Sequence, residues 1–220
     1  MDTRPGLRER KKRQTRERIR ETAMRMFMES GFDNVKVADI ARGADVSEGT
    51  VFNYFPTKED LVFAGMEGFE ADLIDGIRAR APGESVLAAF ARFFSESAPM
   101  IAASSSAYVI AGARIISHSV TLQRKEHEIT DAYTRSLAAL IAEDTAAPPD
   151  DVEPWVAANA LMGVHRAMLD YSRRQAVGGR TGTDLARDVA ARAERAFARL
   201  GAGLADYGAR PQADAVSSKS

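Results

Sequence analysis

The segment VSEGTVFNYFPTKEDL, from Val46 to Leu61, carries side chains that a helix built only to fill a core would not need. Three of them have acceptors, donors or rings that suit the edges of nucleic-acid bases. A glutamate accepts a hydrogen bond from cytosine N4, an asparagine pairs with adenine, and an aromatic ring contacts the methyl group of thymine. The candidates for these contacts are Glu48, Asn53 and Phe52.

Other residues of the same segment suit the phosphate backbone. Thr50 and Tyr54 offer hydroxyl groups and Lys58 offers an ammonium group, and contacts of this kind position a protein on DNA without reading its sequence. Gly49 lacks a side chain near the start of the predicted helix, so the backbone can approach DNA closely there. The alternative is a plain helical hairpin that binds no nucleic acid.

Local patterns predict the elements that hold these side chains. Ser47 is a helix N-cap residue, and Pro56 ends the helix because the residue before proline is driven out of helical geometry. A short amphipathic helix precedes it, over about 37–44, and Asp45 suits the turn because aspartate tolerates left-handed backbone. Two short helices joined by a tight turn form a helix-turn-helix pattern, whose second helix lies in the major groove of DNA.

A basic first helix precedes this pair. Its apolar positions follow helical spacing and predict a helix from about Glu9 to Ser30 that ends at Gly31. Nine lysines and arginines crowd the first twenty residues, although the net charge of the whole chain is −1. A basic arm on a neutral body indicates a polyanionic partner. A solvated, partly disordered tail is the alternative.

The rest of the chain is predicted to be helical, because strand alternation is absent. Thr57 and Asp60 have the spacing of a capping box and begin a fourth helix that reaches about Ala81. We therefore expect an all-α protein of about nine helices. Further helices are expected over about 84–103, 106–117, 119–143, 151–175 and 183–205. The expected divisions are a DNA-binding domain over 1–56, a larger ligand-binding and dimerisation domain over 57–207, and a disordered tail over 208–220.

The stretch from Gly31 to Ala64, GFDNVKVADIARGADVSEGTVFNYFPTKEDLVFA, strongly resembles the DNA-binding domain of the TetR family of bacterial transcription regulators. The resemblance implies DNA contacts for a set of residues between Arg13 and Lys58. Asp45 stands where the family usually has glycine. Lys36 replaces a usual threonine or serine, exchanging a helix cap for a positive charge. The implied contact residues are Arg13, Arg16, Lys36, Ser47, Glu48, Gly49, Thr50, Phe52, Asn53, Tyr54 and Lys58.

The resemblance also implies a helical regulatory domain that binds an effector. The stretch from Ala113 to Glu143 is weakly similar to regulators whose C-terminal domain is described as acyl-CoA-like-ligand binding, which favours a hydrophobic or amphipathic effector. A ligand pocket needs a few polar groups among apolar walls. The candidate ligand residues are Phe69, Phe94, Tyr108, Arg114, His118, Tyr133 and His165.

A homodimer is expected because a protein that reads a palindrome needs a two-fold axis. Long apolar stripes on the last two predicted helices could form a four-helix interface between subunits. In the last helix the stripe includes Leu185, Val189, Ala193, Phe197 and Leu200. The alternative is that both stripes belong to the internal core of one subunit.

Composition excludes several classes of protein. The chain has no cysteine, which removes disulfides, thiolate catalysis and cysteine-based zinc sites. Its three histidines lack ligand spacing, and no catalytic triad or phosphate-binding glycine loop is evident. We therefore expect no metal, no cofactor and no enzymatic activity. No apolar run approaches the roughly 20 residues of a membrane span, which favours a cytoplasmic protein without a membrane partner.

These observations favour a homodimeric transcription regulator that binds a palindromic double-stranded DNA operator and is released as a repressor by a small effector. Two readings stay open beside it within the same class: an activator, and a constitutive dimeric DNA-binding protein without an effector. A third, from a different class, is a helical enzyme or binding module that uses its basic arm on another polyanion.

Overall fold

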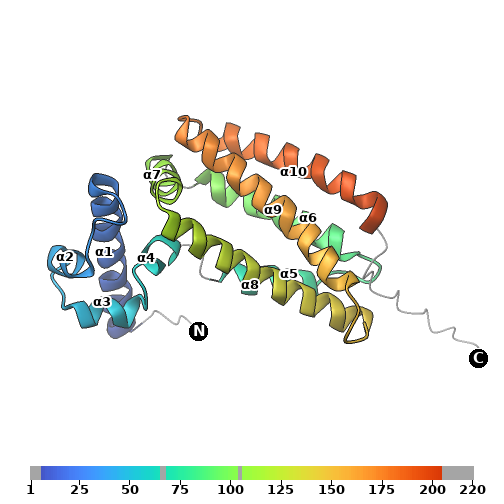
Figure 1. Ribbon diagram of the computed structural model, residues 1–220, viewed down its shortest axis with the longest axis horizontal. Coiled ribbons are helices and arrows are strands. Elements are labelled where there is room, and N and C mark those ends of the chain that lie inside the picture. Colours follow the sequence, from blue (N-terminus) through green and yellow to red (C-terminus); the bar gives the residue numbers. More distant parts are fainter. Residues whose placement is uncertain (1–5, 65–67, 104–105, 205–220) are drawn as a thin grey trace, which may run out of the picture. The chain divides into compact units, whose positions relative to one another are not determined.

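Ten helices and no strands make up the regular secondary structure of residues 6–64, 68–103 and 106–204, the parts of the chain that the computed structural model describes (Figure 1). The all-α prediction is confirmed. The helices are α1 (Leu7–Ser30), α2 (Val37–Gly43), α3 (Glu48–Tyr54), α4 (Asp60–Phe63), α5 (Phe69–Arg78), α6 (Val86–Ala103), α7 (Ser106–Ser117), α8 (Val120–Thr145), α9 (Glu153–Val177) and α10 (Gly182–Leu204).

The helix count exceeds the expected nine because the predicted fourth helix is two helices. The prediction of one continuous helix from Thr57 to about Ala81 is wrong: α4 ends at Phe63, and α5 begins only at Phe69. Gly68 has a left-handed backbone with φ of 89°, which a continuous right-handed helix does not permit. The predicted capping box is present, since Thr57 and Asp60 exchange backbone-to-side-chain hydrogen bonds of 2.9 and 3.3 Å.

The helices group into two compact units, each of which is built from two separate segments of the chain. Unit 1 comprises residues 1–67 and 107–126, and unit 2 comprises 68–106 and 127–220. The expected boundary at residue 56 omits α7 and the start of α8 from unit 1. Two contacts tie this later segment to the earlier one: the Ser119 hydroxyl donates to Asp33 at 3.2 Å, and Lys125 pairs with Asp60 at 3.6 Å. The tail predicted over 208–220 lies outside the described residues.

Unit 1 has an apolar core shared by several short helices. α2 and α3 have seven residues each, too few to be stable alone in water, so their packing on α1 must hold them. α1 contributes Ile19, Ala23 and Phe27 to this core, and all three are fully buried. The corresponding buried residues of the following segments are Ile40, Ala41, Val51, Phe55, Leu61 and Phe63.

The turn between α2 and α3 is a Schellman motif. The Val46 N–H donates to the Ala41 carbonyl at 3.0 Å and the Asp45 N–H donates to the Arg42 carbonyl at 3.2 Å. Asp45 itself is left-handed, with φ of 51°, in the position that most often holds glycine. The turn predicted at Asp45 is therefore present, and α1 ends at Gly31, with φ of 79°, as predicted.

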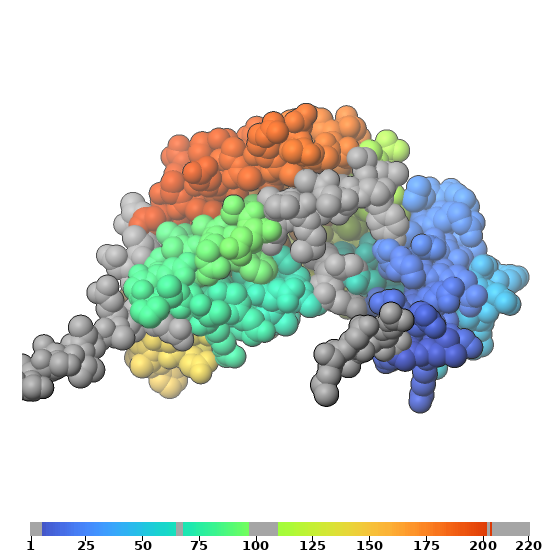
Figure 2. Space-filling model, turned by 180° about the vertical axis from the view of Figure 1, so that it is seen from behind, coloured from blue at the N-terminus to red at the C-terminus, as the bar shows by residue number. Residues whose placement is uncertain are grey.

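Unit 2 is a bundle in which α10 lies along both α6 and α9 and α5 packs on α6 (Figure 1). Figure 2 shows α5, α6 and α10 from the opposite side. Its core draws on all of these helices and on α8. The apolar stripe of α10 was a candidate dimer surface, but Leu185, Val189, Ala193 and Phe197 are buried within this single chain. That stripe is therefore internal core, which was the alternative interpretation of the same pattern.

Two polar clusters fix the ends of the bundle. The buried Arg80, after α5, donates to Asp144 of α8 at 2.7 Å and to the Ile77 carbonyl at 3.1 Å. Between α9 and α10, the Tyr171 hydroxyl donates to Asp188, and Arg192 donates to the same carboxylate at 3.0 Å. None of the described helices is long and apolar enough to cross a bilayer.

Candidate nucleic-acid interface

One face of α3 is open to solvent and carries the residues predicted to read bases. Glu48, Gly49 and Asn53 are exposed, and the large ring of Phe52 is 46% exposed. Val51 points the other way and is 1% exposed, so it anchors the helix to the core as predicted. An exposed phenylalanine in a seven-residue helix is not explained by packing within the unit. The face combines one carboxylate, one amide and one ring over less than two turns.

A side-chain cap fixes the start of this helix. The Thr50 N–H donates to the Ser47 hydroxyl oxygen at 3.1 Å, and the two hydroxyl oxygens lie 2.8 Å apart. Such a cap satisfies one of the backbone donors that every helix start leaves unpaired. The N-cap predicted at Ser47 is therefore confirmed, and both hydroxyl groups help to hold α3 in place.

Basic residues of α1 and α2 lie in the same unit as α3. Arg13 is exposed on α1, and the guanidinium carbon of Arg16 lies 4.8 Å from the centre of the Phe55 ring, directly after α3. Lys36 occupies the N-cap position of α2 and makes no side-chain cap hydrogen bond, so its exposed ammonium group offers positive charge there. Tyr54, at the end of α3, is half-buried.

Lys58 has an internal role that the sequence did not reveal. Its ammonium group donates to the carbonyls of Phe32 and Val35 at 2.9 and 3.0 Å and lies 4.1 Å from the centre of the Phe32 ring. A lysine ammonium group has three N–H donors. Two of those of Lys58 are used here to tie the α1–α2 loop to the segment after α3. The predicted phosphate contact is left with one donor on a half-buried side chain.

Four of the seven candidate ligand residues meet in unit 2. Phe69 of α5 lies next to Tyr133 of α8 and His165 of α9, with ring centres 5.6 and 5.2 Å apart. Phe94 of α6 contacts the same histidine, at 6.3 Å between ring centres. Phe93 and Phe197 extend this group, which we call the aromatic cluster: Phe69, Phe93, Phe94, Tyr133, His165 and Phe197.

Two members of the aromatic cluster titrate abnormally. Burial disfavours the imidazolium and lowers the pKa of His165 from 6.5 to about 4, with a smaller effect of the nearby Arg166 charge. Burial, and to a smaller degree the charge of Glu70, raises the pKa of the Tyr133 hydroxyl. At neutral pH the cluster therefore presents two uncharged polar groups among phenyl rings.

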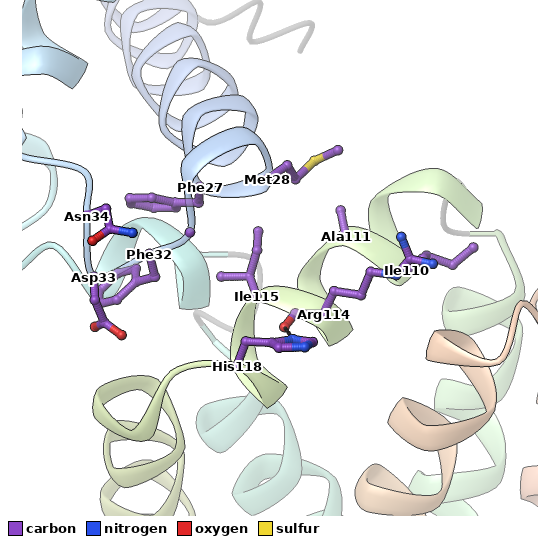
Figure 3. Close-up of a pocket in the computed structure, with 11 residues that line it drawn as sticks. Phe27, Met28, Phe32, Asp33, Asn34, Ile110, Ala111, Arg114, Ile115 and His118 are labelled. Carbon is purple, nitrogen blue, oxygen red and sulfur yellow. Dashed lines mark hydrogen bonds between the residues drawn. The ribbon is translucent and has the colours of Figure 1, made fainter.

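The remaining candidates lie elsewhere. Arg114 of α7 and His118, directly after α7, lie in unit 1, and the side chain of Tyr108 lies outside the described residues. Arg114 and His118 line a pocket of about 590 Å³ between α7, the end of α1 and the α1–α2 loop (Figure 3). Its other walls were not predicted, because nothing in the sequence links α1 to a helix about 80 residues later. The remaining lining residues are Phe27, Met28, Gly31, Phe32, Asp33, Asn34, Ile110, Ala111 and Ile115.

The sequence of unit 1 matches a known family. The profile of bacterial regulatory proteins of the tetR family matches residues 19–64, which run from the middle of α1 through α4. The HTH-type transcriptional regulator TcmR of Streptomyces glaucescens is 30% identical over 90 residues, which are 41% of this chain and 40% of that protein. The chain thus matches less than half the length of this relative.

Solved structures resemble the fold over most of the chain. NalD, the secondary repressor of the MexAB-OprM multidrug efflux pump in Pseudomonas aeruginosa, has a TM-score of 0.59 at 19% identity, over 84% of this chain and 96% of NalD. FadR of Bacillus subtilis, solved in complex with stearoyl-CoA, has a TM-score of 0.52 at 21% identity, over 85% and 98%. The profile match shows that residues 19–64, which include the capped α3 and the Schellman turn, form a domain of the tetR family of bacterial regulatory proteins.

Proposed function

We propose that the protein is a transcription regulator that binds a palindromic DNA operator through α3. The exposed face of α3 carries this proposal, because Glu48, Phe52 and Asn53 supply a carboxylate, a ring and an amide that packing among the described residues of unit 1 does not use. The basic start of α1 supplies charge for phosphates. Such a protein acts in the cytoplasm, where bacterial operators are found.

Selection of bound DNA from a random pool, with the full-length chain, tests this proposal. We expect one near-palindromic sequence, protected in a footprint. The variant Glu48→Ala should change the preferred base at one position of each half-site, whereas Glu29→Ala, an exposed glutamate on α1, should not. Binding without sequence preference, or a preference equally disturbed by both variants, would contradict reading by α3.

The reading of a palindrome by two copies of α3 requires a homodimer. Because the stripe of α10 is internal, the exposed apolar residues at the start of α9 are better candidates for the subunit contact. These are Val152, Trp155 and Val156. Large apolar side chains gathered on one exposed helix end are typical of an interaction surface.

We further propose that a hydrophobic or amphipathic effector binds unit 2 and releases the operator, which makes the protein a repressor. The aromatic cluster supports this proposal, because it brings rings from α5, α6, α8, α9 and α10 together around two uncharged polar groups. The effector must bind one state of the protein better than the other to shift operator affinity.

Addition of stearoyl-CoA, the ligand of the FadR structure, to the operator complex tests this second step. Free coenzyme A is the control for the nucleotide part alone. Loss of operator binding with the acyl compound alone, and increased expression of an operator-linked reporter, would support a repressor released by an amphipathic effector.

One observation favours the alternative of a constitutive regulator. The rings of the aromatic cluster already contact one another, since Phe94 and Phe197 lie 5.9 Å apart and Phe69 and Phe93 lie 5.5 Å apart. An effector would have to separate them. Operator affinity that no amphipathic compound changes would favour this alternative.

A further inference from the structure

The pocket of unit 1 is not used by the functions proposed above. It lies beside α1 and α7 and contains neither an α3 residue nor a member of the aromatic cluster. Its volume of about 590 Å³ falls within the roughly 300–1,000 Å³ of pockets that hold small molecules. Arg114 and His118, which the sequence singled out as ligand candidates, both line it.

One side of the pocket is apolar. Phe27 and Phe32 provide two rings in contact with each other, 5.0 Å between centres, and Ile115 faces them from α7 (Figure 3). Met28 lies at the same pocket and is 58% exposed, although it is a large apolar side chain. Phe27 and Phe32 are already buried, so an occupant with a hydrocarbon part would chiefly cover Met28.

The polar groups of the pocket differ in how far they are already engaged. The Asp33 carboxylate accepts from the Ser119 hydroxyl at 3.2 Å, and the Asn34 amide donates to the Ser30 carbonyl at 2.9 Å. His118 Nδ1 lies 2.7 Å from the Arg114 carbonyl oxygen, which requires a proton on Nδ1 and leaves Nε2 unused by that contact.

Arg114 supplies the charge. Among the described residues, the structure records a hydrogen bond for its backbone carbonyl but no ion pair or hydrogen bond for its guanidinium. A guanidinium binds a carboxylate through two parallel hydrogen bonds. We propose that this pocket binds a small amphipathic carboxylate, with its carboxylate on Arg114 and its hydrocarbon part against Met28, on the side formed by Phe27, Phe32 and Ile115.

This site is separate from the effector site proposed in unit 2, and it does not depend on DNA binding. Its occupant would touch Phe32, whose ring and carbonyl also hold Lys58. Binding would therefore stabilise the α1–α2 loop in its present conformation, as any ligand that binds only the folded state does.

Titration of the full-length chain with decanoate tests the proposal, with 1-decanol as the uncharged control. Methyl resonances of methionine and isoleucine report each unit separately. We expect saturable shifts of the Met28 and Ile115 methyl groups with decanoate, and affinity for decanol about tenfold lower, since a charge-assisted pair contributes about that factor. Shifts confined to Met162 and Ile141 of unit 2, or no shifts, would overturn it.

Two variants sharpen the test. Arg114→Gln should lower decanoate affinity about tenfold and leave decanol unchanged, whereas Arg124→Gln, an exposed arginine of the same unit outside the pocket, should change neither. Ala111→Leu fills the pocket and should abolish both. A decanoate affinity that is the same in Arg114→Gln as in the unaltered chain would refute the carboxylate contact. Methyl shifts that follow protein concentration alone would show that a second copy occupies the pocket.

Discussion

A single ammonium group can hold two segments of chain together when it satisfies backbone carbonyls that have few other partners. Lys58 does this for Phe32 and Val35, which precede it by 26 and 23 residues. Its position over the Phe32 ring adds a cation–π contact. The residue therefore contributes to the stability of unit 1 before any contact with DNA is considered.

The variant Lys58→Met keeps the length and the apolar stem of the side chain but removes its donors. We expect the free energy of unfolding to fall by about 1–2 kcal/mol, because one or both carbonyls lose a charged partner. Urea unfolding followed by circular dichroism measures this loss. Lys11→Met, an exposed lysine on α1, is the control, and an equal loss in both variants would contradict the internal role of Lys58.

His165 makes the stability of the protein depend on pH. Its pKa is about 4 in the folded state and near 6.5 in the unfolded chain, so between these values the unfolded state binds the proton that the folded state excludes. Its contribution is complete above about pH 6.5 and falls, by about 1.4 kcal/mol per pH unit, as the pH drops towards 4.

The variant His165→Phe removes this dependence and keeps a ring in the aromatic cluster. Between pH 7.5 and 4.5, the unfolding free energy of the unaltered chain should therefore fall relative to that of the variant, because only the unaltered chain loses the contribution of the histidine. At pH 7.5 the difference reports packing alone. A difference that stays constant over this range would contradict burial of a neutral imidazole.

At the scale of elements, close approach of α2 to α1 depends on Gly43. A Cβ at this position would lie 2.7 Å from the Met26 methyl carbon and 2.9 Å from Cγ2 of the buried Thr22. The methionine can move, but the threonine is buried within α1. The packing of the helix-turn-helix pair therefore restricts this position to glycine.

We expect Gly43→Ala to lower the free energy of unfolding by about 1–3 kcal/mol, which is typical of overpacking. Gly49→Ala is the matched control, because a Cβ there meets only the Ser47 hydroxyl oxygen, at 3.8 Å. Since alanine favours helix over glycine, this control should be neutral or stabilising. Thermal unfolding measures the stability of both variants. Equal destabilisation would show that the loss of backbone freedom, rather than overpacking, causes the loss of stability in Gly43→Ala.

The elements that the sequence predicted well depend on neighbouring residues. Gly31, Asp45 and the Ser47 cap act within a few positions, so the limits of α1, α2 and α3 follow from local chemistry. The partners of Lys58 and the opposite wall of the Arg114 pocket lie far away in the sequence and left no local pattern. Likewise, helical periodicity shows that α10 has an apolar face, but not whether α6 or a second subunit covers it.

At the scale of the whole molecule, the proposed homodimer gives a prediction about surface residues. Val156 is 59% exposed at the start of α9, next to Trp155, whereas Val120 is 71% exposed in unit 1. We expect Val156→Glu to shift the protein from dimer to monomer in sedimentation velocity, because a charge would be buried between subunits.

Val120→Glu is the control for the same change of residue at another exposed site, and it should leave the association state unchanged. Neither substitution disturbs the core of a subunit, so the circular dichroism of both variants should match the unaltered chain. Dissociation by both, or by neither, would contradict a subunit contact at the start of α9.

The continuity of α8 has a consequence for how the protein opens. This helix runs from Val120 to Thr145, yet its residues up to Glu126 belong to unit 1 and those from His127 onward belong to unit 2. The N–H groups just after the boundary donate to carbonyls just before it, so loss of structure in unit 1 removes their partners. Amide hydrogen exchange along α8 should therefore change over about one turn of the helix rather than at a single residue.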